Sequence, residues 1–358
     1  MKRIACISLT LLLTATFVQQ QGCTDRFPLE SLAQAQVPLT LGDTTYVEIV
    51  PPFAGFNQPG GILIGNDQLL YVADTKNDRI VMMNVAGQFL AARRIVSPQS
   101  IAQDLRLDLL IGGVVVQANG DSVGALFRIK LVGSQHNLAN AELDTLWQET
   151  ARPRRRFLGV AVMPDNKFLA LRSGPDNSSF VDPDSRILIF NANDVFLTPL
   201  ADLVTRAGSG ITDINRPTAI AAFPNSKDFI VLQSSAGIAY GALWMTYQLS
   251  ADFDGWLPKF DPARIDQRFI DFIRPNRFVN PAGVVVDARR RDIFITDAAM
   301  DSVLKFDSRG RFKPESFGFA ATGGRLRRPT GVAFFDKTLY VADALENKIF
   351  RFKLSTDF

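Results

Sequence analysis

Short apolar segments recur along the chain and alternate with polar residues at a period of two. Three of them start at a Pro and run through a Gly into an apolar stretch, at residues 59–64, 281–286 and 329–334. Each is followed by a second apolar stretch that ends in an acid, at Asp74, Asp297 and Asp343. A third, alternating stretch comes next, as in residues 348–354. The period of two predicts β-strands, and we find no long amphipathic helix.

Weaker copies of this unit begin at Pro98, Leu158 and Pro217, so the unit starts six times. Repeats of roughly 40 to 65 residues, each with several short strands, are typical of β-propellers. The last unit has only three strands before Phe358, whereas the strand at residues 44–50 has no partner of its own. Pairing the two would remove both open edges. The sequence therefore predicts an all-β fold, a six-bladed propeller of four-stranded blades closed by its N-terminal strand.

The repeat resembles the NHL-repeat propellers, whose motif runs Pro-x-Gly-hydrophobic and then Val-Ala-Asp-x-x-Asn-x-Arg-Ile. The first unit matches it best, with Pro59, Gly61, Asp74, Asn77 and Arg79. The fifth and sixth units keep the Pro, Gly and Asp but depart from the motif at its Asn. The resemblance covers residues 44 to 358, strongly in three units and loosely in three. It implies the fold and says little about activity.

The residues that recur with the repeat are expected to be structural. An Asp at the end of a strand can accept hydrogen bonds from the following turn or pair with a nearby Arg such as Arg79. Lys348 recurs at the same place in the last unit. The repeated glycines are expected to allow close packing where the first strands begin; they are Gly61, Gly283 and Gly331.

The N-terminus has the pattern of an export signal. Three residues with two basic side chains precede a fifteen-residue apolar stretch, residues 4–18, which is too short to span about 30 Å of hydrocarbon. Gly22-Cys23 then resembles the cleavage site of bacterial lipoproteins, although Gln20 and Gln21 depart from that family's preference. We predict a signal peptide at 1–22, a lipidated Cys23, a tether at 23–42 and a propeller at 43–358. An ordinary secretory signal is the alternative.

The amino-acid composition limits the kinds of partner and metal site that the protein can have. Hydrophobic residues make up 47% of the chain, enough for a large core, and 39 basic against 36 acidic residues leave a net charge of +3. This balance does not indicate a nucleic-acid partner. One histidine, His136, and two cysteines, Cys6 and Cys23, exclude most zinc sites and disulfide frameworks. We therefore expect no cofactor and no metal, and we interpret His136 as a solvated residue of a polar loop.

Arginines gather just before the first strands of the units, where the loops of a propeller open on one face. We take Arg154, Arg155, Arg327 and Arg328 as candidate binding residues. Guanidinium groups recognise carboxylates and phosphates, but ion pairs between blades are an equally open interpretation. Two insertions on the same face bring aromatic candidates, which are Phe180, Tyr240 and Trp256. A third group could ligate calcium but lacks the spacing of an EF-hand loop; it is Asp176, Asp182 and Asp184.

These features predict an exported, lipid-anchored propeller that serves as a non-catalytic binding or assembly module of the cell envelope. Its partner would be an envelope protein or an acidic glycan or peptide, with the membrane reached through the anchor. The alternative is a metal-dependent hydrolase or lactonase that uses the central channel. By resemblance to the regucalcin-like lactonases, Glu48 and Asn280 are conceivable ligands in that case. A purely structural envelope subunit is the third possibility.

Overall fold

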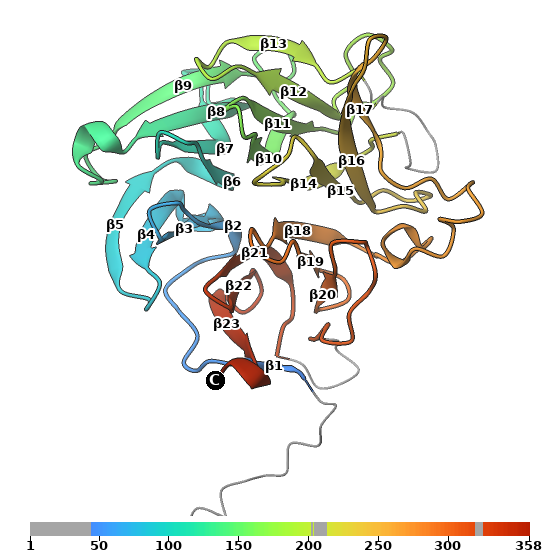
Figure 1. The fold of residues 1–358 in the computed structure, drawn as a ribbon. Helices are drawn as coiled ribbons and strands as arrows, with labels where there is room; N and C mark the ends of the chain where they lie inside the picture. Colours follow the sequence, from blue (N-terminus) through green and yellow to red (C-terminus); the bar gives the residue numbers. More distant parts are fainter. Residues whose placement is uncertain (1–43, 202, 204–212, 319–324) are drawn as a thin grey trace, which may run out of the picture. The chain divides into compact units, whose positions relative to one another are not determined.

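Six antiparallel sheets surround one axis and form a six-bladed β-propeller (Figure 1). This computed structural model describes residues 44–201, 203, 213–318 and 325–358. The predicted signal peptide at 1–22 and tether at 23–42 lie outside these residues. No helix in the described part of the chain is long and apolar enough to cross a membrane. The predicted fold class is confirmed.

The strands follow the predicted units. Blade one consists of β2 (Pro59–Ile64), β3 (Leu69–Asp74), β4 (Arg79–Asn84) and β5 (Phe89–Arg94). Blade two consists of β6 (Val96–Gln103), β7 (Leu109–Val116), β8 (Ser122–Lys130) and β9 (Glu142–Gln148). Blade three consists of β10 (Arg156–Val162), β11 (Phe168–Ser173), β12 (Arg186–Phe190) and β13 (Phe196–Pro199). Blade four consists of β14 (Pro217–Ala222), β15 (Phe229–Gln233), β16 (Ala242–Leu249) and β17 (Asp254–Pro258).

The last two blades complete the ring. Blade five consists of β18 (Pro281–Val286), β19 (Ile293–Asp297) and β20 (Ser302–Phe306). Its fourth position is held only by isolated bridges, from Val303 to Phe317 and from Phe306 to Phe312. Blade six consists of β21 (Pro329–Phe335), β22 (Thr338–Asp343), β23 (Lys348–Leu354) and β1 (Tyr46–Glu48).

The N-terminal strand closes the ring as predicted. β1 pairs antiparallel with β23, and Tyr46 lies opposite Leu354 while Glu48 lies opposite Phe352. The pairing continues beyond β1, because the Ile49 amide donates to the Arg351 carbonyl at 2.8 Å. The outer edge of β23 is thus paired, and β1 takes the outermost position in the sheet of blade six.

The innermost strands define the axis and two faces. They are β2, β6, β10, β14, β18 and β21, and each contacts the innermost strand of the next blade around the ring. All six carry a register shift near their first residues, which marks a β-bulge. We call the face at which these strands begin the bulge face. We call the opposite face, where the hairpins between first and second strands turn, the hairpin face.

Apolar packing holds the blades to one another. One cluster of buried apolar side chains lies between each pair of neighbouring blades. Tyr71 of blade one, for example, packs with Leu109 and Ile111 of blade two, and all three are fully buried. Both faces of each inner sheet are therefore covered, which explains the nearly continuous apolar runs of the first and second strands.

The strand-end acids fasten the loops of the bulge face. In three blades the acid accepts a hydrogen bond from the amide two residues before the first strand; these bonds join Asn57 to Asp74, Val279 to Asp297 and Arg327 to Asp343, each at 2.7 Å. Asp74 also accepts from Arg79 at 2.7 Å. The structural role predicted for these residues is confirmed. In blade four Gln233 takes the same place and accepts from the Asn215 amide at 2.9 Å.

Glycine is required where innermost strands meet at the bulge face. A Cβ at Gly331 would lie 2.4 Å from the Gly60 carbonyl oxygen of the next blade, and a Cβ at Gly283 would lie 2.6 Å from the Thr330 oxygen. Real Cβ atoms do not approach backbone this closely, so the neighbouring blade would have to move. The predicted packing role of these glycines is confirmed.

Replacing Gly331 with alanine should therefore destabilise the ring. We expect Gly331→Ala to lower the free energy of unfolding by about 1–3 kcal/mol, because added volume strains a packed contact. Gly133→Ala is the matched control, since a Cβ there meets nothing within 4 Å. It should change stability by no more than about 0.5 kcal/mol. Urea unfolding measures both; equal midpoints for the two variants would show that the close approach does not constrain the ring.

Candidate functional site

A central channel runs along the axis and is divided into two chambers. Six side chains, one from each blade, line both chambers and form what we call the girdle; they are Ile62, Ile101, Val160, Ile220, Val284 and Val332. Each lies near the middle of its innermost strand. The girdle therefore separates a bulge chamber of about 320 Å³ from a hairpin chamber of about 590 Å³. Both volumes fall in the range of small-molecule sites.

The bulge chamber is built from the six β-bulges. Its wall includes the bulged residues of the first strands, among them Leu158, Thr218, Ala282 and Thr330. Two threonine hydroxyls hold the wall together by bonds to the next blade. Thr218 donates to the Pro281 carbonyl and Thr330 to the Pro59 carbonyl, both at 2.7 Å. Arg328 reaches the same chamber.

The hairpin chamber has mostly apolar walls with a polar rim. Ile64, Val162, Val286 and similar side chains line it, and the amides of Asn66, Gln68 and Gln103 supply its polar side chains. Gln103 is buried and donates from Nε2 to Asp67 at 2.8 Å, and its Oε1 accepts from the Asn66 amide at 2.6 Å. This chamber is therefore joined through Gln103 to a carboxylate just behind its rim.

That carboxylate lies beside the only histidine of the chain. His136 Nδ1 is 3.9 Å from Asp67 Oδ2, is shielded from solvent and has no hydrogen-bond partner. Asp67 is fixed by the Tyr71 hydroxyl at 2.6 Å and by the Leu69 amide at 3.1 Å. Burial and the bond to Asp67 raise the pKa of Tyr71, so its hydroxyl remains a donor.

The interpretation of His136 as a solvated residue of a polar loop holds for only part of its ring. Its ring is 38% exposed, but its inner nitrogen faces Asp67 from another blade. The loop that carries it follows β8 and is pinned by Leu131 and Leu138, both fully buried in the cluster between blades one and two. The sequence could not show this contact, because 69 residues separate the partners and neither belongs to the repeat motif.

The channel does not offer a site for a divalent metal ion. No carboxylate of the described residues lines either chamber, and this part of the chain holds no group of three or more His, Cys, Asp or Glu placed to share an ion. Glu48 lies on the closing strand and pairs with Arg325 at 3.1 Å. Asn280 donates its backbone amide to Asp297. The ligands conceivable from the sequence thus do not meet at the axis.

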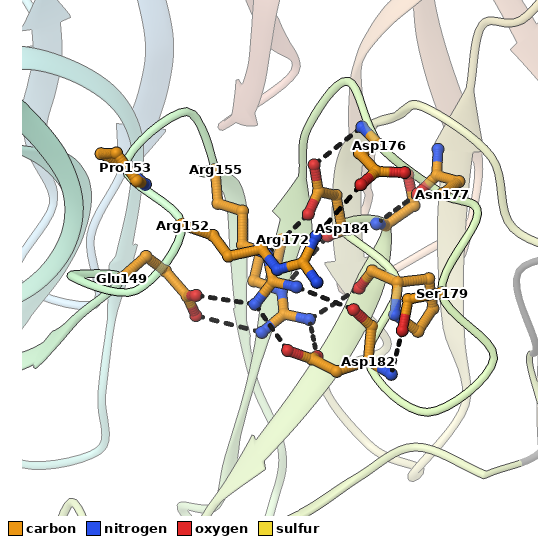
Figure 2. Close-up of polar contacts among 12 residues, drawn as sticks. Glu149, Arg152, Pro153, Arg155, Arg172, Asp176, Asn177, Ser179, Asp182 and Asp184 are labelled. Atoms are coloured by element: carbon orange, nitrogen blue, oxygen red, sulfur yellow. Dashed lines mark hydrogen bonds and ion pairs between the residues drawn. The ribbon is translucent and has the colours of Figure 1, made fainter.

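Arg155 is part of a buried ion cluster in blade three (Figure 2). Its side chain contacts Glu149 at 3.0 Å, Asp182 at 2.8 Å and Asp184 at 2.7 Å, and it is only 3% exposed. Arg172 lies beside it and shares Glu149 and Asp182. Burial alone would lower the pKa of the Arg155 guanidinium, but the three carboxylates together raise it. Arg155 therefore joins the end of blade two, through Glu149 just after β9, to the loop between β11 and β12 of blade three.

The other predicted arginines have different surroundings. Arg154 is exposed, although it precedes the buried Arg155 directly. Arg327 is 71% exposed and lies 3.5 Å from Glu346. Arg328 is exposed at the mouth of the bulge chamber and lines it. Of the four, Arg328 is the one that the structure places in a cavity of the channel.

The three aromatic candidates do not gather on one surface. Phe180 is 96% exposed at the tip of the loop between β11 and β12. Tyr240 packs on the cluster between blades four and five. Trp256 lies in β17, where it packs against Phe229 and donates to the Lys227 carbonyl at 2.7 Å. Its placement in an insertion was wrong, because residues 254–258 form the fourth strand of blade four.

The acidic residues of the blade-three loop are occupied by arginines and amides. Asp182 and Asp184 belong to the ion cluster of Arg155, and Asp176 contacts Arg152 at 3.1 Å. The Asp176 amide also donates to Asp184 at 2.8 Å, which folds the loop on itself. Protein donors thus fill the positions that a calcium ion would need.

Comparison with solved structures finds the same fold in proteins of several kinds, among them enzymes and a nutrient-binding protein. No family model matches the chain, and no curated protein matches it either. A gluconolactonase from Xanthomonas campestris has a similar structure, with TM-score 0.58 and 13% identity over 87% of this chain and 90% of that one. A luciferin-regenerating enzyme gives TM-score 0.60 and 12% identity over 86% and 95%. The PQQ-bound aldose sugar dehydrogenase of Streptomyces coelicolor gives 0.59 and 11% over 87% and 98%.

These likenesses correct the predicted function. The expected non-catalytic binding or assembly module is contradicted, because the similar structures include lactonases and sugar dehydrogenases. At 11–13% identity the likeness establishes the propeller fold and transfers no residue roles.

The ion cluster of Arg155 makes a stability prediction with a neighbouring control. Arg155→Met should lower the free energy of unfolding by about 3–5 kcal/mol, because it leaves buried carboxylates without their partner. Arg154→Met removes an exposed charge and should change it by no more than about 0.5 kcal/mol. Thermal and urea unfolding of both variants test this. A mild effect of Arg155→Met, equal to that of Arg154→Met, would show that the cluster contributes nothing to stability.

Proposed function

We propose that this protein hydrolyses a small ester or lactone held in the hairpin chamber. The observation that carries the proposal is the pair of Asp67 and His136, which Gln103 joins to the rim of that chamber. The structural likeness to a gluconolactonase supports the reaction class. The pairing of a histidine with a fixed carboxylate supports the mechanism, because such a carboxylate orients the ring and stabilises its charged form.

Asp67 is suited to orient a base. Donors from Tyr71, Gln103 and Leu69 hold its carboxylate, so it does not turn away from His136. His136 Nδ1 lies 3.9 Å from Asp67 Oδ2, which is longer than a hydrogen bond, and catalytic hydrogen bonds are often long before substrate binds. Nδ1 would then donate to Asp67, which leaves Nε2 free to accept a proton.

The reaction follows from these positions. Nε2 of His136 takes a proton from a water molecule as the water oxygen bonds to the carbonyl carbon of the substrate. The bond between that carbon and the alkoxy oxygen then breaks, and His136 returns the proton to the departing oxygen. A lactone opens to a hydroxy acid, and an ester gives an acid and an alcohol. The side-chain amides of Asn66 and Gln68 line the chamber and can donate to the oxyanion that forms.

The proposal requires no metal ion. The chambers lack carboxylates among the described residues, so no step is routed through a bound cation. Activity should accordingly survive treatment with a chelator. Activity in the presence of a chelator would distinguish this mechanism from the metal-dependent hydrolase or lactonase considered from the sequence.

Substitution of His136 tests the proposed base. His136→Gln should lower kcat for p-nitrophenyl acetate and for small lactones at least 100-fold, the scale of general-base catalysis. Asp67→Asn should also lower it, by removing the charge that faces the ring. Gln135→Asn, in the same loop, is the control and should keep the parent rate. The rates are measured in a pH-stat with and without EDTA. Unchanged turnover by His136→Gln, or no turnover by the parent protein, would refute the proposed base.

We infer that the repeat is of the NHL type. Asn77 donates to Asp74 at 2.8 Å and Arg79 donates to it at 2.7 Å, so the motif residues of blade one form one connected unit. Blades five and six retain the acid in the same place. This supports a common origin for the blades and leaves the activity to residues outside the motif.

We also propose that the protein is exported and anchored through a lipid on Cys23. The support is the sequence of residues 1–25, with its basic start, its short apolar stretch and its Gly-Cys pair. Anchoring by one residue outside the propeller is compatible with a ring that is complete from residue 45 onward. The hydrolysis proposed above does not depend on this location.

Cys23→Ala tests the anchor. The variant should fold with the parent melting temperature, because Cys23 lies outside the propeller, and it should move from the membrane fraction to the soluble fraction. Fractionation of expressing bacteria and the mass of the N-terminal peptide measure this. Cys6→Ala is the control, since it leaves the predicted lipid attachment site intact. Membrane association that is unchanged in Cys23→Ala, with no acyl mass in the parent, would contradict the anchor.

A further inference from the structure

The bulge chamber contains one charged side chain. Among the described residues that line it, Arg328 is the only ionisable one, and the polar side chains are neutral; they are Gln99, Ser100, Thr218 and Thr330. No acid among the described residues lines the chamber, although the buried Asp343 accepts the backbone amide of Arg328. Arg328 thus places one cationic side chain at the mouth of the chamber.

Arg328 is held at its backbone while its side chain remains available. Its amide donates to both oxygens of the buried Asp343, at 3.1 and 3.2 Å. Within the described part of the chain, its guanidinium makes no hydrogen bond or ion pair. Arg327 differs, because it lies near Glu346 and does not line the chamber. The two neighbouring arginines therefore form a natural pair of test and control.

The bulges supply uncharged hydrogen-bonding groups around this cation. Each bulge leaves at least one residue of the innermost strand outside the regular ladder, so its backbone groups are free for another partner. The innermost strands are also the edge strands of their sheets on the side of the axis. Gly60 and Gly61 are half-buried and line the chamber without side chains, whereas Gly283 and Gly331 line it but are buried against the next blade.

We propose that the bulge chamber binds a small carboxylate that carries hydroxyl groups. The carboxylate would pair with the Arg328 guanidinium, whose planar donors match its two oxygens. The hydroxyls would pair with the backbone and side-chain groups of the bulges. A volume of about 320 Å³ accommodates a molecule of roughly the size of a six-carbon hydroxy acid.

This inference goes beyond the proposed hydrolysis and does not depend on it. The groups proposed for catalysis lie at the hairpin face, on the other side of the girdle. Opening of a lactone produces a hydroxy acid, so the bulge chamber would take the class of molecule that the hairpin chamber releases. Binding can be measured without any turnover.

Three probes separate the charge from the hydroxyls. Isothermal titration is carried out with sodium D-gluconate, with sorbitol and with sodium hexanoate on the parent protein, on Arg328→Gln and on Arg327→Gln. The parent should bind gluconate more tightly than either sorbitol or hexanoate. Arg328→Gln should weaken gluconate binding at least tenfold and leave sorbitol binding within twofold. Arg327→Gln should bind all three like the parent.

Several outcomes would overturn the proposal. One is a parent protein that binds gluconate no better than sorbitol, since the charge would then play no part. Another is equal weakening by Arg327→Gln and Arg328→Gln, which would point to general surface charge. His136→Gln should keep the parent affinity for gluconate, so a failure of the hydrolysis proposal and a failure of this one give different results. Matching melting temperatures of the two arginine variants exclude misfolding as a cause.

Discussion

The space between innermost strands at the bulge face sets the geometry of the whole ring. There the backbone of one blade approaches the next so closely that a Cβ at Gly331 or Gly283 would overlap a carbonyl oxygen. Apolar side chains fill the space between blades elsewhere, so this contact limits how closely neighbouring sheets can approach at the bulge face. The bulges follow from the same constraint, because a strand that must pass its neighbour without a side chain bends out of its ladder. The two chambers are what this arrangement leaves on either side of the girdle.

At the bulge face, buried charged side chains are paired with hydrogen-bond donors or with opposite charges. Buried acids receive backbone amides in three blades, and in blade three a cluster around Arg155 satisfies several acids at once. Such groups would be costly to bury alone. With these charges paired inside the protein, Arg328 remains as the ionic group of the channel. Of the four candidate arginines, Arg155 is buried in the fold, and Arg328 differs from the exposed Arg154 and Arg327 because it lines a cavity.

The architecture could be predicted from the sequence because it repeats. The Pro, Gly and Asp positions recur with the blades, and the unpaired strand at residues 44–50 matched a blade that lacked one strand. Blade four already shows the limit, since Gln233 replaces the acid and Trp256 lies in a strand where an insertion was expected. The girdle residues could have been predicted from the sequence. In five of the blades, the girdle residue lies three positions after the Pro of the first strand.

The site was harder to predict because it is not periodic. Asp67 lies in a hairpin turn of blade one and His136 in an outer loop of blade two, and only the packing of that loop on Leu131 and Leu138 brings them together. Because the two residues do not recur at a fixed spacing in the sequence, no motif predicts their contact. The arginine-rich segments led to a wrong expectation because they do recur along the chain. Their composition suggested a common surface, whereas burial separates Arg155 from the exposed Arg154 beside it.

The closing strand has a consequence for the order of events during synthesis. β1 emerges before every other strand of the propeller, whereas its partner β23 is the last of these strands in chain order. Blades one to five can therefore form before blade six, which is incomplete until β21, β22 and β23 have been made and β1 has paired with β23. Until then the nascent chain is an open arc whose terminal sheet edge is exposed to any other strand. Synthesis of β23 allows β1 to pair with it and closes the arc into a ring. The pairing of these two strands is therefore the last step in forming the propeller.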